Sequence, residues 1–275
     1  MLYRLFDILR VFVVFLDFAA DGTQCLKFRI AYAALPALLL AGCGSGGTGG
    51  NSSAPAAAPV AAVPAPAGQK WVDVVTKTPE GGYRMGNPNA AVKLIEYGSR
   101  TCPHCAAFDA EGFPALKSGP IAAGKLSYEF RDFPIHAQMD LGPILLGHCV
   151  EPNQFFPMLE QMMLSQQALL GDGSKQIPEA DQARLQNAQP AAIAAYLAEF
   201  YGYLDFVKQR GVPDAKARAC LADKDMLAEI AKNADAANKQ YQVPGTPAFI
   251  VNGDIVPDVA DWKGLQPSLK AAGAL

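Results

Sequence analysis

The order of apolar and polar positions predicts alternating strands and helices in the second part of the chain. Residues 92–97 form a mainly apolar run and residues 126–131 alternate between apolar and polar, so we predict a strand in each. The segment 102–117 between them has helical character, and Pro114 predicts a bend near residues 112–114.

A long helix-rich stretch, residues 139–220, follows the second predicted strand. It is interrupted by helix-breaking residues, namely Pro143, Pro152, Pro157, Gly171–Gly173 and Pro190. Residues 223–241, which have Ala-rich and Lys-rich faces, predict a separate helix. We therefore expect a helical insertion in this part of the chain.

The C-terminal segment predicts a hairpin and a closing helix. Residues 247–251 and 254–257 flank Asn252-Gly253, a pair that favours the type I′ turn of hairpins. Residues 261–272 predict the last helix. Strands separated by helices and followed by a hairpin indicate an α/β fold with a mixed central sheet.

The N-terminal region has the organisation of a secretion signal, which we place at residues 1–42. Lys27 and Arg29 precede an uncharged apolar stretch that is too short to span a bilayer comfortably. The stretch ends in Leu-Ala-Gly-Cys43, which resembles a bacterial lipobox, whose cysteine is lipidated and becomes the first residue of the mature protein. The alternative is an ordinary signal peptide that happens to contain a cysteine.

Residues 1–25 fit this scheme poorly, because charged side chains interrupt every apolar run. We predict that translation starts near Leu26, through an alternative start codon, so that residues 1–25 are a mis-called start. The alternative is a true N-terminal membrane anchor. Peptides from residues 1–25 in a mass spectrum of the precursor would contradict the first interpretation.

Residues 43–70 predict a lipidated cysteine followed by a disordered tether. This segment is rich in Gly, Ser, Ala and Pro, and it buries too little apolar surface to offset the entropy of ordering the chain. The folded part is then residues 71–275, enough for one domain with a helical insertion at about residues 133–222. The net charge of −3 is too small to indicate nucleic acid as a partner.

Two cysteines separated by two residues, Cys102 and Cys105, carry the chemistry that the sequence indicates. They lie where a predicted strand passes into a helix, and the N–H groups and dipole of a helix N-terminus favour the thiolate. Pro103 stiffens the turn at the first helical position, and a protonated His104 adds a cation beside the sulfur. The thiolate is the reactive form in disulfide exchange, so we predict a redox-active pair.

Other roles for a C-x-x-C motif fit the sequence less well. A structural zinc site needs four ligands, but the chain has one such pair, and His136 and His148 lie elsewhere without ligand spacing. A c-type haem site needs histidine directly after the second cysteine, where Ala106 stands. We therefore expect no metal and no cofactor.

The order of these elements and motifs resembles the thioredoxin fold. A strand, the C-x-x-C helix, a second strand, a helical insert and a Thr-Pro pair before a hairpin follow one another in that order. The insert resembles that of the DsbA branch, and Cys-Pro-His-Cys is identical to the motif typical of DsbA oxidases. The resemblance covers residues 90–275, leaves residues 71–89 outside, and implies an α/β thioredoxin fold with an inserted helical domain.

The resemblance also implies roles for single residues. Cys102 is expected to be the exposed nucleophile and Cys105 the buried resolving thiol. Thr246-Pro247 is expected to be the cis-proline loop, whose backbone pairs with an extended substrate. The alternative is an ordinary proline at the start of a strand. Many DsbA oxidases have Val before this proline, and Thr also occurs in isomerase-type relatives.

Glu96 matches the acidic residue beneath the active site of DsbA relatives. There its carboxyl group could move the proton of Cys105 when a mixed disulfide is resolved. The alternative is a solvated residue at the edge of an alternating strand. The sequence leaves both interpretations open.

Cys149 and Cys220 bracket the helical insert. Two remaining cysteines in an oxidising compartment usually pair, and closing a loop of this length stabilises a protein by roughly 4 kcal/mol in the chain-entropy model. Some DsbA-like proteins carry such a second disulfide, which we predict here. The alternative is two buried free thiols.

The resemblance implies a thiol:disulfide oxidoreductase that introduces disulfides into exported proteins. We expect it in the periplasm, lipid-anchored to the membrane, with reduced exported proteins as substrates and a DsbB-like membrane protein as reoxidant. One alternative is a disulfide isomerase or reductase of the same fold, although isomerases of that type usually carry an N-terminal dimerisation domain. Another is a non-catalytic lipoprotein that handles a metal through its two thiols.

Overall fold

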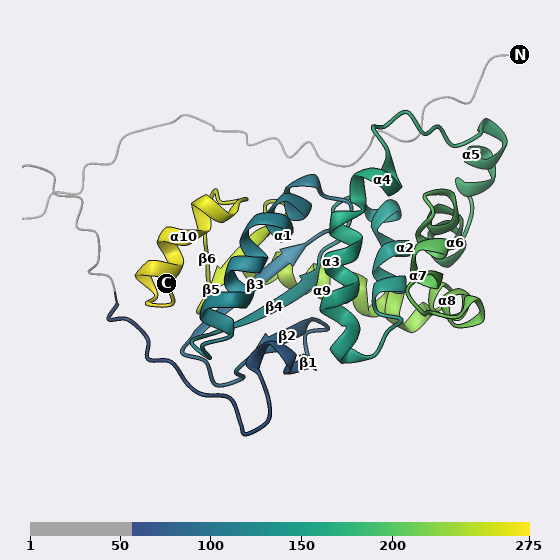
Figure 1. Cartoon of the computed structure of the whole chain (residues 1–275). Coiled ribbons are helices and arrows are strands. Elements are labelled where there is room, and N and C mark those ends of the chain that lie inside the picture. The colour runs from purple at the N-terminus through teal and green to yellow at the C-terminus, as the bar shows by residue number, and fades with distance from the viewer. Residues whose placement is uncertain (1–56) are drawn as a thin grey trace, which may run out of the picture. The chain divides into compact units, whose positions relative to one another are not determined.

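The computed structural model describes residues 57–275 (Figure 1). The predicted signal region 1–42, the lipidation site Cys43 and the first part of the predicted tether lie outside the described residues. Within the described part, no helix is both long and apolar enough to cross a bilayer.

A mixed sheet forms the centre of the described region. Its strands are, in spatial order, β1 (Val75–Lys77), β2 (Tyr83–Gly86), β4 (Leu126–Asp132), β3 (Val92–Gly98), β5 (Ala248–Val251) and β6 (Asp254–Ile255). Strands β3 and β4 run parallel, and the other neighbours run antiparallel. The predicted mixed sheet is confirmed. Asn252 and Gly253 both have positive φ, as a type I′ turn between β5 and β6 requires.

Strands β1 and β2 extend the sheet beyond the predicted elements. β2 pairs with β4 along its whole length, and β1 pairs with β2. Residues 71–89, which the family resemblance does not cover, therefore belong to the same sheet. Strands of three and four residues are too short for their alternation to stand out in the sequence.

Helices cover both faces of the sheet (Figure 1). The helices α1 (Pro103–Leu116), α3 (Phe155–Leu164) and α10 (Trp262–Ala271) share one apolar core with the sheet, whereas α9 (Lys224–Tyr241) packs on the other face. The alternation along β3 separates the two cores, because Leu94 faces α1 and Tyr97 faces α9. Glu96 has the parity of Leu94 and therefore points toward α1.

Helix α1 carries a proline in its interior. Pro114 lies inside α1, and the chain continues from the helix end into a π-helical turn, Lys117–Ile121. A proline in a helix interior removes one backbone hydrogen bond and clashes with the preceding turn. Helix α1 nevertheless continues through residues 112–114, where the sequence predicts a bend, and the irregular turn follows at residues 117–121.

The helical insertion lies between β4 and α9. Its remaining helices are α2 (Ala137–Gly147), α4 (Gln166–Leu170), α5 (Glu179–Leu185), α6 (Pro190–Phe200), α7 (Tyr203–Lys208) and α8 (Asp214–Leu221). Helices α2, α6, α7 and α8 enclose a second apolar core together with α3, and this core includes Ile144, Ala198 and Val207. A disulfide between Cys149 and Cys220, with an S–S distance of 2.00 Å, joins the end of α2 to α8.

The end of the predicted tether is part of the folded domain. The backbone N–H of Ala57 donates to the Ala271 carbonyl, and that of Val63 donates to the Ala123 carbonyl, both at 2.9 Å. The Trp71 indole N–H donates to the Val63 carbonyl at 2.7 Å. We call residues 57–70 the strap. The prediction of a disordered tether up to residue 70 is therefore wrong for these residues, because backbone hydrogen bonds and one tryptophan hold them.

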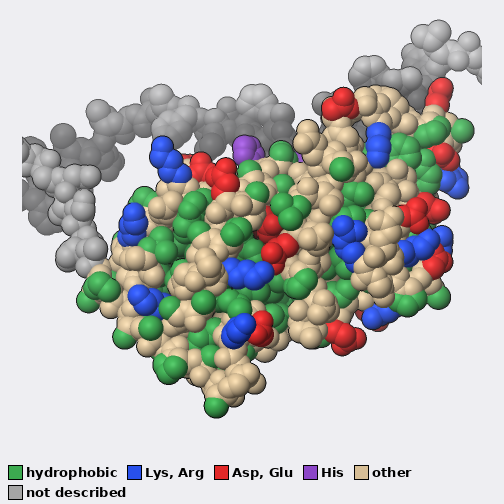
Figure 2. Space-filling view, in the orientation of Figure 1, with side chains coloured by type: hydrophobic (Ala, Val, Ile, Leu, Met, Phe, Trp, Pro, Cys, Tyr) green, Lys and Arg blue, Asp and Glu red, His purple; other side chains and the backbone are tan. Residues whose placement is uncertain are grey.

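Acidic and basic side chains are interspersed on the face that Figure 2 shows. Hydrophobic side chains lie between them, over the helices that cover this side of the sheet. The face shown therefore carries no large area of a single sign of charge.

Candidate active site

The two cysteines of the C-x-x-C motif lie at the carboxyl end of β3. The strand ends at Gly98, a three-residue turn follows, and Cys102 is the N-cap of α1, which starts at Pro103. Both thiols are free. Cys105 is fully buried and Cys102 is 5 % exposed, so the predicted exposed nucleophile is in fact largely covered. The cover is the loop before β5, because the Cys102 Sγ lies 3.1 Å from the Thr246 carbonyl oxygen.

The surroundings of Cys102 favour its thiolate. Its pKa is lowered to about 5, chiefly because the Cys105 thiol donates a hydrogen bond to the sulfur. Burial acts in the opposite direction, while the Thr246 side chain and the backbone N–H groups of Cys105 and His104 also lower the pKa. His104 thus acts here through its backbone N–H, and its side chain is exposed.

The pKa of Cys105 moves the other way. Burial raises it well above its ordinary value, and the hydrogen bond to Cys102 and the charge of Glu96 add to the rise. The backbone N–H of Ser99, 3.4 Å from the Cys105 Sγ, opposes it weakly. One thiol is therefore ionised and the other protonated at neutral pH.

Glu96 lies beneath this pair in the interior of the protein. Its side chain is 2 % exposed, so the interpretation as a solvated edge residue is wrong. Burial raises the pKa of Glu96 to about 8, although the Tyr128 hydroxyl donates to its carboxyl group at 2.6 Å and opposes the rise. The carboxyl group is therefore largely protonated at neutral pH.

The peptide bond between Thr246 and Pro247 is cis. The pair lies directly before β5, which is the antiparallel neighbour of β3. The structure thus places the Thr246 backbone opposite Cys102, where the resemblance predicts it.

Helices of the insertion hold the turn before Cys102, which the sequence analysis did not anticipate. Asp140 of α2 is fully buried and accepts hydrogen bonds from Ser99 Oγ and from the backbone N–H and Oγ1 of Thr101. Gln166 of α4 donates to the carbonyl oxygens of Arg100 and Cys102, at 3.1 and 3.0 Å. A signal was present, since Asp140 is the one charged residue within the otherwise uncharged segment 137–147.

Arg100 fixes the same turn from inside the protein. Its guanidinium is fully buried and pairs with Asp132 at the end of β4, with an Nε–Oδ1 distance of 2.7 Å. His148 bonds the other carboxylate oxygen at 2.7 Å. A side chain at position 147 would collide with the guanidinium, so Gly147 is required there. His148 is therefore part of the packing around Arg100 and not of the dithiol site.

A groove of about 530 Å³ begins beside the dithiol. It runs between α1 and the α3–α4 segment and is lined by residues such as Thr101, Pro103, Ala106 and Leu164. Leu164 is 64 % exposed, which is unusual for a large apolar side chain.

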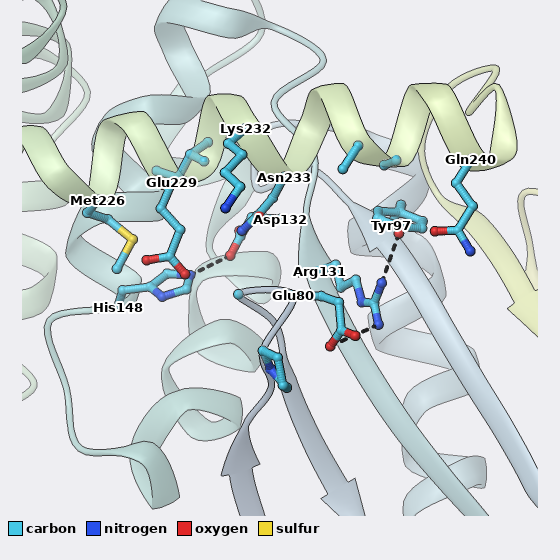
Figure 3. A pocket seen from close by; sticks show the side chains of 15 residues that line it. Glu80, Tyr97, Arg131, Asp132, His148, Met226, Glu229, Lys232, Asn233 and Gln240 are labelled. Carbon is cyan, nitrogen blue, oxygen red and sulfur yellow. Dashed lines mark hydrogen bonds and ion pairs between the residues drawn. The ribbon is translucent and has the colours of Figure 1, made fainter.

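A second cavity, of about 200 Å³, lies between α9 and the sheet (Figure 3). Its charged groups are largely paired with one another, because Arg131 bonds both Tyr97 and Glu80, and His148 bonds Asp132. Neither cysteine of the motif lines it. Among residues 57–275, moreover, no group of three or more His, Cys, Asp and Glu side chains is placed to hold a metal ion.

A dithiol at a helix N-terminus, a cis-proline against it and a buried carboxyl group beneath it define a thiol–disulfide exchange site. The family model Thioredoxin_4, described as thioredoxin, matches residues 78–271. The chain therefore belongs to the thioredoxin family, and the predicted thioredoxin fold with its helical insertion is confirmed.

Three known proteins illustrate the likeness. The structure described as a protein-disulfide isomerase from Novosphingobium aromaticivorans is 32% identical, with a TM-score of 0.65, and the match covers 69% of this chain and 95% of that one. A putative protein-disulfide oxidoreductase of Rickettsia bellii is 27% identical over 67% of this chain. The match spans 62% of that relative's own length. The structure of α-DsbA1 from Wolbachia pipientis, at 21% identity and a TM-score of 0.54 over 70% of this chain and 91% of that one, has the same fold.

Proposed function

We propose that this protein is a thiol:disulfide oxidoreductase that introduces disulfides into exported proteins through Cys102 and Cys105. The observation that carries the proposal is the opposite shift of the two thiol pKa values, with Cys102 lowered to about 5 and Cys105 raised. A stabilised thiolate favours the reduced form of the pair, so the disulfide form is a strong oxidant.

The site supplies what each step of such a reaction needs. A client thiolate attacks Cys102 Sγ, a new S–S bond forms, the 102–105 bond breaks, and Cys105 leaves as a thiolate. Glu96, which is neutral below a pH of about 8, can protonate that buried thiolate. A second client thiol then attacks the client sulfur of the mixed disulfide, and Cys102 leaves readily because its thiolate is stable.

The substrates that we propose are reduced, unfolded exported proteins. The groove beside Cys102 is largely apolar and open, which suits an extended segment next to a client cysteine. The Thr246 backbone on the other side of Cys102 supports strand-like pairing with the same segment. The location that we propose is the periplasm, with a lipid anchor on Cys43 and a DsbB-like membrane protein that restores the disulfide.

The reduction potential of the 102–105 pair tests the proposal. We expect a value well above that of thioredoxin, about −270 mV. In parallel, Cys105→Ala whose Cys102 is first converted to a mixed disulfide with glutathione should accumulate mixed disulfides with reduced client proteins as glutathione leaves, and Cys102→Ala should not. A potential near −270 mV would overturn the oxidising direction, and an absence of adducts with Cys105→Ala would overturn the order of attack.

The second candidate is a disulfide isomerase or reductase of the same fold. Two observations favour it: Thr246 precedes the cis-proline, and the relative from N. aromaticivorans is described as an isomerase. Refolding of a scrambled substrate separates the two functions, because an isomerase restores activity from non-native disulfides while an oxidase acts mainly on the reduced chain. The metal-handling alternative predicts bound copper or zinc in the purified protein, which metal analysis detects.

A further inference from the structure

A buried carboxylate collects hydrogen bonds around the turn that leads into Cys102. Four donors converge on Asp140: the Ser99 hydroxyl at 2.8 Å, the Thr101 N–H at 3.1 Å, the Thr101 hydroxyl at 3.0 Å and the His136 N–H at 3.0 Å. Asp140 itself is fully buried. An acceptor with this many donors fixes the direction in which each hydroxyl proton points.

The direction of the Thr101 proton determines the state of His136. Thr101 Oγ1 lies 2.8 Å from His136 Nδ1 and 3.0 Å from Asp140 Oδ1. A threonine hydroxyl has one proton, and it is committed to the carboxylate, which can only accept. We therefore assign the proton of this contact to His136 Nδ1, which donates to Thr101 Oγ1. In the neutral imidazole the second nitrogen, Nε2, then carries the lone pair and is a base.

This imidazole lies at the rim of the dithiol site. His136 is exposed, on the loop between β4 and α2, and its partner Thr101 directly precedes Cys102. The neighbouring Ile135 approaches the loop that bears the cis-proline, since a Cβ at Gly245 would lie 4.0 Å from its Cδ1. Residues 135 and 136 thus contact both segments that flank Cys102, the turn before it and the loop with the cis-proline.

We infer that His136 is a further catalytic residue, which takes the proton from the incoming client thiol, and that Asp140 and Thr101 are positioning residues that hold its Nε2 ready. The inference rests on the proposed function, because it concerns the attack of a thiol on the 102–105 disulfide. The charged or titratable groups around His136 are Asp140 of α2, the Cys102 thiol and the buried Arg100 of the turn, which is paired with Asp132; the described loop 242–247 contributes none.

The step balances in protons and electrons. The client S–H bond breaks, His136 Nε2 gains the proton, and the client thiolate attacks Cys102 Sγ. One S–S bond forms and the 102–105 bond breaks, so that the client sulfur is oxidised and Cys105 is reduced. The imidazolium then returns its proton to solvent, to which His136 is exposed.

The rate acceleration that such a base can give has an upper limit. A client thiol with a pKa of about 8.5 is about 3 % ionised at pH 7, so full deprotonation accelerates the attack by about 30-fold at most. A thiol that is already ionised at pH 7 gains nothing. A base is therefore identified by comparing how much the loss of His136 slows the attack of each of these two thiols.

The test uses the oxidised full-length protein under excess thiol at pH 7, and it measures the rate of attack for two probes. One probe is a short cysteine peptide with an ordinary thiol pKa, and the other is an aromatic thiol that is already ionised. His136→Gln retains a hydrogen-bond donor for Thr101 but has no base. We expect it to slow the peptide thiol about 5- to 30-fold and to leave the aromatic thiol unchanged. Gln138→Ala, an exposed change on the adjacent helix, is the matched control.

Two further measurements separate catalysis from structure. Added imidazole should restore the rate of His136→Ala with the peptide thiol, and Asp140→Asn should slow the same reaction with little added effect in the His136→Gln background. Equal slowing of both thiols, or no slowing of either, would overturn the inference. Attack under excess thiol proceeds in an oxidant and in a reductant alike, so this outcome is independent of the reduction potential that tests the proposed function.

Discussion

The pair Cys102 and Glu96 shows how single residues acquire unusual properties from their position. Cys102 is buried just beyond the carboxyl end of β3, and Glu96 is buried on the face of β3 toward α1. The pKa of Cys102 nevertheless falls to about 5, while that of Glu96 rises to about 8. The difference comes from hydrogen-bond donors. Cys102 receives them from Cys105 and from the helix start, whereas Glu96 has the Tyr128 hydroxyl alone against full burial.

Replacing Cys105 should expose this dependence in Cys102. The Cys105 thiol is the largest cause of the lowered pKa, so Cys105→Ala should raise the Cys102 pKa from about 5 toward its ordinary value. The ultraviolet absorbance of the thiolate or the rate of alkylation follows this titration directly. A midpoint that stays near 5 in the variant would show that the backbone N–H groups suffice.

Replacing Glu96 by Gln should stabilise the protein at neutral pH. The unfolded carboxyl group ionises near pH 4.5 and the folded one near 8, so the wild type loses stability as the pH rises through this window. The loss is about 1.4 kcal/mol per pH unit, or about 3 kcal/mol at pH 7, and Gln retains an acceptor for Tyr128. Urea unfolding of both proteins at pH 5 and pH 7 measures it. An equal difference at the two pH values would contradict the raised pKa.

At the scale of elements, the helical insertion both adds a core and holds the active-site turn. Asp140 and Gln166 reach that turn from α2 and α4, and the 149–220 disulfide ties α2 to α8 within the insertion. The bond lies away from the dithiol, so it contributes to stability and not to exchange.

Removing this disulfide should therefore separate stability from redox properties. The Cys149→Ala, Cys220→Ala double variant opens a loop with a sequence separation of 71 residues. The chain-entropy model then predicts a loss of about 4 kcal/mol in the free energy of unfolding. Denaturant unfolding measures this loss, and the reduction potential of the 102–105 pair should remain that of the wild type. A changed potential would mean that the insertion transmits strain to the active-site turn.

The sequence predicts the long elements of this fold and the dithiol, because period and motif are local properties of the chain. Helix α9, the β5–β6 hairpin and Cys102 at a helix start all follow from residues that are close in sequence. The short strands β1 and β2 do not, since tertiary pairing with β4 stabilises them. The contacts of Asp140 with the turn are not predicted either. The two segments are about 40 residues apart in the chain, and a single sequence does not show which distant residues will be in contact.

At the scale of the whole molecule, the strap decides where the chain leaves the domain. It runs past Ala123, before β4, and past Ala271 at the end of α10. Strands β3 and β4 are parallel, so the start of β4 and the carboxyl end of β3 lie at opposite ends of the strands. The strap is therefore held at the end of the sheet where β4 starts, and the dithiol lies at the other end.

Weakening the strap should leave the exchange chemistry intact. Trp71→Phe removes the hydrogen bond to the Val63 carbonyl, a bond worth about 1 kcal/mol. We expect cleavage within residues 57–70 by a non-specific protease to become about five-fold faster, with an unchanged reduction potential. Unchanged cleavage would show that the backbone hydrogen bonds alone hold the strap.

The strap also determines how many residues separate Cys43 from the domain and where the chain enters the domain. If Cys43 carries the proposed lipid, 13 residues, 44–56, separate it from the strap, and a chain of 13 residues spans at most about 50 Å. The strap enters the domain at the end of the sheet opposite the dithiol, so such an anchor would attach to the domain far from the reactive sulfur. A reoxidant embedded in that bilayer would then contact the Cys102 sulfur only after the domain rotates relative to its anchor. Lengthening or shortening residues 44–56 should therefore alter the rate of reoxidation far more than the rate of client oxidation.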